Sequence, residues 1–165
     1  MWCRAHYLDA SALVKLVADD PDDEPGRESL RDYYRTHAAN VYATSFSVAE
    51  TFSAFKSKLL RKRINKDQYI EYIRSFIRTV LGSNLRIDEV AILSPLVSRA
   101  DQIIKTHQID FLDCLQILTI LEGRFRHNGP NSKSLLITAD NGLAIAARAE
   151  GATVWLCTNE PAPVD

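Results

Sequence analysis

The chain has 165 residues, of which 46% are hydrophobic and 25% are charged, and its formal net charge is -1. These values are typical of a globular protein and exclude a disordered, collagen-like or low-complexity chain. A charge this close to zero also excludes a bulk attraction to nucleic acid, so any such binding requires a local basic patch. The length fits one domain, or one domain with a small appendage.

Three scattered cysteines, Cys3, Cys114 and Cys157, predict neither a disulfide framework nor a zinc site. Unpaired cysteines of this kind are typical of a reducing compartment. Residues 1–6 lack the apolar run of a signal peptide. No apolar stretch reaches the roughly 18 residues that a membrane helix needs. The sequence therefore predicts a cytoplasmic protein without membrane contact.

The first predicted element is a short apolar strand at residues 4–8, which ends in Asp9 and leads into a helix. The acidic, proline-containing segment 19–25 predicts a solvated loop. At the start of the third helix, Ser47 and Glu50 fit the S-x-x-E capping box. The elements expected up to residue 82 are, in order, strand 4–8, a helix after Asp9, helix 26–37, strand 41–43, a helix from 44 that ends in the basic run 56–66, and a helix closed by Gly82.

The helix closed by Gly82 carries both aliphatic and aromatic side chains at helical spacing. We expect the aliphatic set on its buried face; this set is Ile70, Ile73, Ile77 and Val80. Three aromatic residues, Tyr69, Tyr72 and Phe76, would offer a stacking surface for bases. Beside these isoleucines, we expect core or dimer packing for them instead.

The second half of the chain continues the alternation of strands and helices. Pro95 places a helix start at residues 94–95, because an interior proline breaks a helix. The run 134–138 has no polar alternation, which is typical of a buried parallel strand. The elements expected are strand 85–87, a helix from 94, a helix from about 110 to 125, a loop 126–133, strand 134–138, helix 140–151 and strand 152–156.

Strands thus alternate with helices five times, which predicts an α/β fold with a central parallel sheet. We expect a single domain at residues 1–158 and a loose C-terminal tail at 159–165, which holds two prolines.

Four acids fall near strand ends or helix starts, where α/β folds build their sites: Asp9, Glu50, Asp113 and Asp140. Each has a plain structural alternative. Asp9 and Asp140 can cap the helices that follow them, and Glu50 can belong to its capping box. Asp113 can gain from the helix dipole, with Asp110 as the cap.

If these four acids converge, they would repel one another, and a divalent cation resolves that conflict. Hard cations such as Mg²⁺ prefer carboxylate oxygens. A pocket loaded with Mg²⁺ or Mn²⁺ suits phosphodiester hydrolysis, because the metal lowers the pKa of a bound water and stabilises the charge on the phosphorane.

Four short segments resemble the motifs of the PIN domain, specifically of VapC-type toxins: residues 7–16, 43–50, 109–115 and 137–140. The resemblance covers residues 4 to about 157 and implies a three-layer α/β/α sandwich with a five-stranded parallel sheet. It also implies a metal-dependent endoribonuclease, a VapB-type antitoxin that inserts a peptide into the active-site groove, and a homodimer. In this resemblance the acidic set is Asp9, Glu50, Asp113 and Asp140.

The same resemblance makes Ser11 and Thr138 polar helpers at the rim of the site, with capping or turn bonding as the alternative. Asp110 is an ambiguous fifth acid, for which we prefer the role of a helix cap. Two positions depart from the pattern. Cys114 stands where the family often has alanine, and Gln116 where many relatives have histidine or tyrosine.

Substrate contacts are predicted from basic residues near these motifs. The cations Arg61, Lys62 and Arg63 lie in the basic run and could guide RNA phosphates, or they could form a solvated helix end or an antitoxin contact. Lys15 lies beyond Ser11 and could face the rim, although a plain surface lysine is the expected role.

Two alternative functions stay open at this stage. One is an RNA-processing nuclease outside a toxin system, which the sequence cannot separate from a toxin. The other is a non-catalytic, partner-binding α/β module in which the acids only cap helices.

Overall fold

The computed structural model describes residues 5–83, 85–126 and 134–164. The expectations for Cys3, for the first four residues and for loop positions 127–133 lie outside this part of the chain. Within it, no helix combines the length and the apolar character that crossing a membrane requires.

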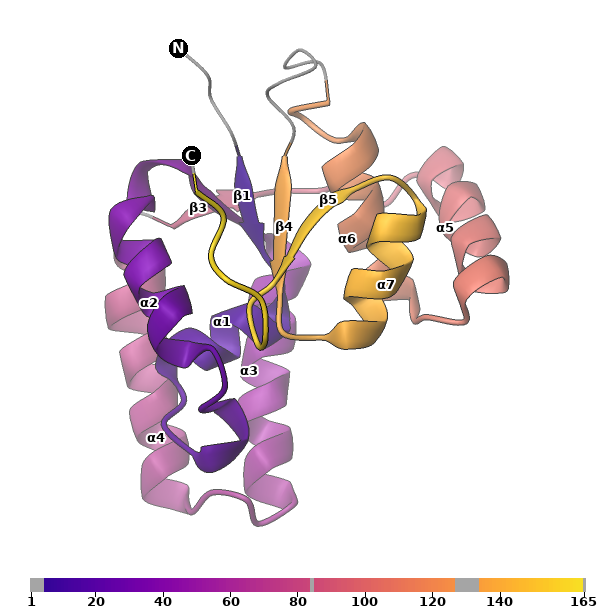
Figure 1. The fold of residues 1–165 in the computed structure, drawn as a ribbon. Helices are drawn as coiled ribbons and strands as arrows, with labels where there is room; N and C mark the ends of the chain where they lie inside the picture. The colour runs from indigo at the N-terminus through magenta and orange to yellow at the C-terminus, as the bar shows by residue number, and fades with distance from the viewer. Residues whose placement is uncertain (1–4, 84, 127–133, 165) are drawn as a thin grey trace.

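A five-stranded parallel sheet forms the centre of the molecule (Figure 1), with the strand order β3-β2-β1-β4-β5. Its strands are β1 His6–Leu8, β2 Val41–Thr44, β3 Arg86–Asp88, β4 Leu135–Thr138 and β5 Thr153–Leu156. All four pairings are parallel, which confirms the predicted sheet. The chain places β2 and β3 on one side of β1 and then β4 and β5 on the other, so a switch point lies between β1 and β4. At such a point, α/β folds open a crevice at the carboxyl edge of the sheet.

Seven α-helices of the described residues surround this sheet: α1 Ala10–Val17, α2 Arg27–Thr36, α3 Ser45–Leu60, α4 Lys66–Ser75, α5 Ser94–His107, α6 Phe111–Glu122 and α7 Asn141–Ala149. Short 3₁₀ turns cover Pro21–Asp23 and Ala38–Asn40, and a π-helical turn at Phe76–Leu81 continues α4. The helix α6 ends at Glu122, three residues before the end expected from the sequence, because Gly123 terminates it.

Alternate strand residues face two separate cores, as the period of a strand requires. Leu8, Ala43 and Ile137 pack in the core that the first four helices cover. Their neighbours Tyr7 and Leu136 pack against α5, α6 and α7 on the other face. The molecule is therefore the three-layer α/β/α sandwich that the sequence predicts.

The helix closed by Gly82 buries its aromatic stripe and only part of the aliphatic face expected in the core. Tyr72, Phe76 and Val80 are buried, whereas Ile77 is 49% exposed. Phe76 packs edge-on against Phe55, with ring centroids 6.0 Å apart. Aromatic rings bury more apolar area than isoleucine, so the aromatic stripe takes the core position. The expected core role of Tyr72 and Phe76 is confirmed, and the burial expected for Ile77 is wrong.

The capping box expected at Ser47 and Glu50 is absent. The N-cap of α3 is Thr44, whose Oγ1 accepts a hydrogen bond from Ser47 N at 3.1 Å. The helix thus begins at Ser45, and Glu50 lies in its second turn. The strand β2 runs one residue further than expected, so the earlier hydroxyl is the one positioned to cap.

The first part of the tail predicted to be loose is held in place. Glu160 forms an ion pair with Arg148 at 2.7 Å, and its backbone oxygen accepts from Trp155 Nε1 at 3.1 Å. The segment after β5 is therefore tethered at Glu160, and the domain boundary at residue 158 stays a prediction.

Candidate metal and active site

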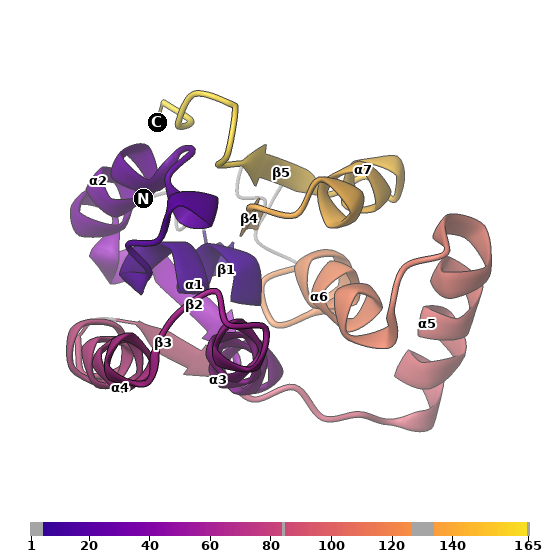
Figure 2. The same cartoon turned by 90° about the horizontal axis from the view of Figure 1, so that it is seen from below.

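A small cavity opens at the carboxyl edge of the sheet, at the switch point between β1 and β4. Figure 2 views the molecule from below, where the strands end and α1, α3 and α6 gather. The cavity has a volume of about 170 Å³. We call it the acidic cavity; its lining residues are Asp9, Ala10, Ser11, Ser47, Glu50, Asp110, Leu112, Asp113, Gln116, Asp140 and Leu143.

All four acids predicted for the site line this cavity, and Asp110 makes a fifth. The lining holds five carboxyl groups and, among the described residues, no lysine, arginine or histidine. Segments more than a hundred residues apart in the sequence are thus brought to one small space. The convergence expected of Asp9, Glu50, Asp113 and Asp140 is what the fold produces.

Asp9 is the most enclosed acid of the cavity, with 7% of its surface exposed. It caps α1 through a hydrogen bond from Ala12 N to Oδ1 at 2.8 Å. Ser11 Oγ donates at 2.9 Å, and Thr138 Oγ1 donates to Oδ2 at 2.7 Å. Burial raises the pKa of Asp9 to about 6, although these three donors oppose the shift. Asp9 is thus both a cap and a carboxylate held rigidly at the cavity wall.

The two predicted polar helpers join the ends of β1 and β4. Ser11 Oγ accepts a hydrogen bond from Ala139 N at 2.8 Å, and Thr138 Oγ1 accepts one from Asp140 N at 2.9 Å. Asp140 lies exposed at the rim and caps α7, because its Oδ1 accepts from Leu143 N at 3.0 Å. Ser11 and Thr138 therefore orient the two acids that follow the central strands.

Glu50 and Asp113 differ from these two acids because neither is a cap. Their carboxyl groups are half-buried and form no hydrogen bond within the described part of the chain. Burial, followed by the nearby charges of Asp110 and Asp9, raises the pKa of Glu50 to about 7. Burial and the charges of Asp110, Asp140, Asp9 and Glu50 raise the pKa of Asp113 to about 7. Capping does not explain why these two acids lie here.

Asp110 has the role expected for it, since it is the N-cap of α6. Its Oδ1 accepts a hydrogen bond from Asp113 N at 2.9 Å. Its charge still acts on the cavity, because it helps to raise the pKa of both Glu50 and Asp113.

The chemistry of this lining fits a hard divalent cation. Carboxylate oxygens are the ligands that Mg²⁺ and Mn²⁺ prefer, and a cation would relieve the repulsion that adds to burial in raising the pKa values of Asp9, Glu50 and Asp113. Within the described residues, no three acidic, histidine or cysteine side chains already form a closed ligand cage. To hold one ion between them, these side chains would therefore have to move closer together.

Two buried polar residues of the cavity, Ser47 and Gln116, were not predicted as site residues. The S-x-x-E spacing placed Ser47 one turn before Glu50 but was interpreted as a cap. Gln116 was noted only as a departure from the family pattern. The available signal is the amide itself, because Gln116 lies within the largely apolar run 114–121, where a buried amide is unexpected.

A larger groove adjoins the acidic cavity and shares Ala10, Ser11 and Asp140 with it. It has a volume of about 390 Å³ and we call it the side groove. Lys15 lines it and is only 2% exposed, so the expected role as a plain surface lysine is wrong. The Lys15 ammonium donates to the backbone oxygen of Asp23 at 3.0 Å.

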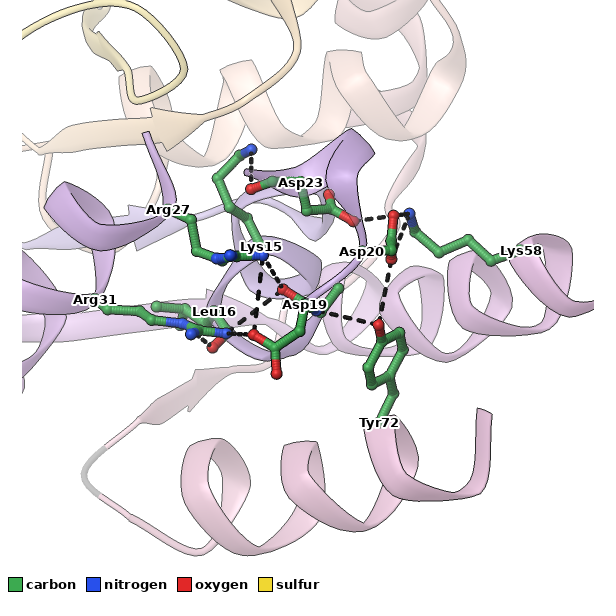
Figure 3. A network of polar contacts seen from close by, with 10 residues as sticks. Lys15, Leu16, Asp19, Asp20, Asp23, Arg27, Arg31, Lys58 and Tyr72 are labelled. Carbon is green, nitrogen blue, oxygen red and sulfur yellow. Dashed lines mark hydrogen bonds and ion pairs between the residues drawn. The ribbon is translucent and has the colours of Figure 1, made fainter. Parts of the chain in front are cut away.

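The acidic loop, residues 19–25, forms one wall of this groove through Asp22 and Asp23. Most of its residues are exposed, as the sequence predicts, but Asp20 is buried and Asp23 is half-buried. Figure 3 shows Lys58 of α3 between Asp20 and Asp23, with its Nζ 2.9 Å from Asp20 Oδ1 and 2.7 Å from Asp23 Oδ2. These contacts raise the pKa of Lys58 although burial opposes them. A cation from the basic run thus fixes the acidic loop.

The same network anchors the other end of the acidic loop (Figure 3). Arg31 on α2 reaches Asp19 Oδ1 at 3.0 Å, and Asp19 N donates to Tyr72 Oη at 3.1 Å. The loop therefore joins α1, α2, α3 and α4 into one unit beside the acidic cavity.

The predicted substrate cations, residues 61–63, lie at the tip of the α3–α4 hairpin. Figure 1 shows this hairpin extending well beyond the carboxyl ends of the strands. All three side chains are exposed, and Arg63 lies 3.8 Å from Asp22. The rise of an α-helix puts Arg61 about 16 Å from Glu50 along the axis of α3. These residues lie outside the acidic cavity, and no contact in the structure tests their predicted role.

A larger cavity lies elsewhere, between the β3–α5 connection and α6. It has a volume of about 610 Å³, and some of the residues in the segments 88–99 and 118–126 line it. Its lining mixes leucines with both signs of charge and carries no cluster of acids like that of the acidic cavity. The chemistry of the side chains, rather than the size of the cavity, therefore locates the candidate site.

Comparison with known proteins gives a family and a fold. The family model of the PIN domain matches residues 6–149. The structure of FitAcB from Neisseria gonorrhoeae is 18% identical, covers 94% of this chain and 99% of that chain, and superposes with a TM-score of 0.62. That of PAE2754 from Pyrobaculum aerophilum is 17% identical, covers 92% and 84%, and has a TM-score of 0.60. A search among curated proteins finds no match.

Proposed function

Because the chain belongs to the PIN domain family, we propose that it is a metal-dependent endoribonuclease that hydrolyses RNA phosphodiester bonds. PIN domains are generally nucleases, and they generally use a divalent metal ion. The observation that carries the proposal is the acidic cavity itself, in which five carboxyl groups share about 170 Å³. Capping accounts for Asp9, Asp110 and Asp140, and the dipole of α6 favours Asp113 in its first turn. Neither explains Glu50, nor why all five acids line one cavity.

The residues that would hold the ion are Asp9, Glu50, Asp113 and Asp140. Mg²⁺ or Mn²⁺ in this place supplies an activated water and charge stabilisation for phosphodiester hydrolysis. Ser11 and Thr138 keep the Asp9 carboxylate in one orientation, which limits the reorganisation needed when an ion binds. We keep Asp110 as a cap that adds negative charge to the cavity.

RNA would enter along the side groove and the α3–α4 hairpin. The ammonium of Lys15 lies in the wall of the groove, and residues 61–63 present exposed cations at the hairpin tip. Phosphates contacted at these places would align the strand so that one phosphodiester group meets the acidic cavity.

We further propose that the protein is the VapC-type toxin of a type II toxin–antitoxin pair, on the strength of the motif resemblance. A VapB-type antitoxin would then cover the side groove, and a homodimer is the expected assembly. Ile92, Leu93 and Val97 at the start of α5 are exposed apolar residues that suit a protein contact. Growth arrest on expression, relieved by Asp9→Asn, separates the toxin from an RNA-processing nuclease, whose expression would not arrest growth.

The test of the nuclease activity combines Mn²⁺ calorimetry with cleavage of a fluorescent RNA. The wild type should bind Mn²⁺ and cleave, whereas Asp9→Asn should lose both activities and keep its fold, since asparagine also caps helices. Asp101→Asn, an exposed acid on α5, is the matched control and should behave as wild type. Full cleavage by Asp9→Asn, or a wild type that takes up no metal, would contradict the proposal.

A further inference from the structure

Gln116 is a buried amide in the wall of the acidic cavity. It is 2% exposed and lies on α6, one turn after Asp113. Its Oε1 accepts a hydrogen bond from Ser47 Oγ at 2.9 Å and another from Thr44 Oγ1 at 3.3 Å. Both hydroxyls belong to the corner between β2 and α3, so the amide is held between the two helical layers.

The nitrogen end of this amide has no acceptor. Gln116 Nε2 is fully enclosed and donates no hydrogen bond within the described part of the chain. Buried amide groups are almost always paired, and an orphaned one points to a partner that is missing or has another position. Because Ser47 and Thr44 hold the oxygen, the partner must lie on the side of the nitrogen.

Asp113 is the acceptor best placed to become that partner. It precedes Gln116 by three residues, and side chains on an α-helix lean toward the N-terminus, over the turn that carries the earlier residue. Glutamine and aspartate at such spacing form side-chain hydrogen bonds. The carboxyl group of Asp113 forms no hydrogen bond among the described residues, so an oxygen is available when the side chain moves.

We propose that Gln116 is a positioning residue for the metal ion: when the ion binds, Nε2 donates to the Asp113 oxygen that faces away from it. Ser47 and Thr44 hold the amide in the orientation that this bond needs. The proposal rests on the proposed function, because it requires Asp113 to be a ligand. Partners that hydrogen-bond a metal ligand typically change the metal affinity by about 10–100-fold.

The test measures Mn²⁺ affinity by calorimetry and the unfolding temperature of the metal-free protein. Gln116→Met keeps the volume and removes the donor, so it should weaken Mn²⁺ binding by about 10–100-fold. It should leave the metal-free unfolding temperature unchanged, because it removes an unpaired buried donor, and because the Ser47 and Thr44 hydroxyls, whose oxygens are 2.7 Å apart, can bond each other when the acceptor is lost. Gln116→Glu still accepts from Ser47 but cannot donate as a carboxylate, so it should not restore tight binding.

A matched control and a double variant make the assignment specific. Thr119→Val changes another buried polar residue of α6, which faces the large cavity, and should keep the wild-type affinity. In the Asp113→Asn background, Gln116→Met should have little further effect on Mn²⁺ binding, because the shared bond is already changed.

Each outcome has one meaning. A wild type that binds no Mn²⁺ overturns the proposed function as a whole. A wild type and a Gln116→Met variant with equal affinity overturn only this inference, and slower RNA cleavage at equal affinity would assign the donor to the substrate instead. A lower metal-free unfolding temperature in Gln116→Met would show a structural role and overturn it as well.

Discussion

Replacing Asp113 by asparagine should make the metal-free protein more stable at high pH. Burial and four neighbouring carboxylates raise the pKa of Asp113 from 3.8 to about 7. One pKa unit corresponds to about 1.4 kcal/mol, so the full shift is worth about 4 kcal/mol. The side chain is half-buried, and solvent screening reduces this to about 2 kcal/mol.

The direction of the effect follows from proton binding. The folded state holds this proton up to a higher pH than the unfolded chain, so the free energy of unfolding of the metal-free wild type falls as pH rises from 3.8 to about 7. Asp113→Asn has no carboxylate to repel. Its free energy of unfolding should therefore exceed that of the wild type by about 2 kcal/mol at pH values above this window, or roughly 4–8 °C in unfolding temperature for a chain of this length. Below the window the two proteins should be equally stable.

The assay is thermal unfolding, followed by circular dichroism in a chelator, below and above this pH window. Asp67→Asn is the matched control. Asp67 is an exposed acid in the first turn of α4, so it shares with Asp113 the interaction with a helix dipole but neither the burial nor the neighbouring carboxylates. At saturating Mn²⁺ the wild type should be more stable than Asp113→Asn, since the wild type binds the ion more tightly. Equal stability of wild type and Asp113→Asn at high pH would refute the reasoning.

Three further changes test other parts of the structure. Lys58→Met removes the ion-pair partner of the buried Asp20 and the half-buried Asp23 and should lower the free energy of unfolding by about 3 kcal/mol in urea titrations; wild-type stability would disprove this. Thr138→Val removes a donor to Asp9, so the pKa of Asp9 should rise further and Mn²⁺ binding should require higher pH in calorimetry; an unshifted pH profile would argue against it. Neutralising residues 61–63 to glutamine should flatten the salt dependence of RNA affinity, whereas Lys105→Gln on α5 should not; an unchanged slope would assign the hairpin tip to plain surface.

The strand ends could be predicted from sequence because their signals are local. Asp9 and Asp140 each follow a short apolar run and precede a helix, and both features lie within a few residues. The start of α3 was misjudged because Thr44 and Ser47 are both competent caps. Only the length of β2, which its pairing with β3 fixes through Thr44 and Asp88, decides between them.

Contacts between distant residues had no such signal. Lys58 meets Asp20 across 38 residues, and nothing in either segment indicates this ion pair. The burial of Lys15 likewise depends on where the acidic loop folds back. The role of Gln116 was hidden for the same reason, since Ser47 belongs to the opposite helical layer and lies 69 residues away.

The acidic cavity contains two pairs of acids that differ in how firmly hydrogen bonds hold their carboxyl groups. Asp9 and Asp140 are each held by a backbone donor of the helix that they begin. Glu50 and Asp113 form no such hydrogen bond in the described part of the chain. In the proposed metal site, adjustment to cations of different size would therefore come from Glu50 on α3 and Asp113 on α6, whereas the carboxyl groups that follow β1 and β4 would stay in place.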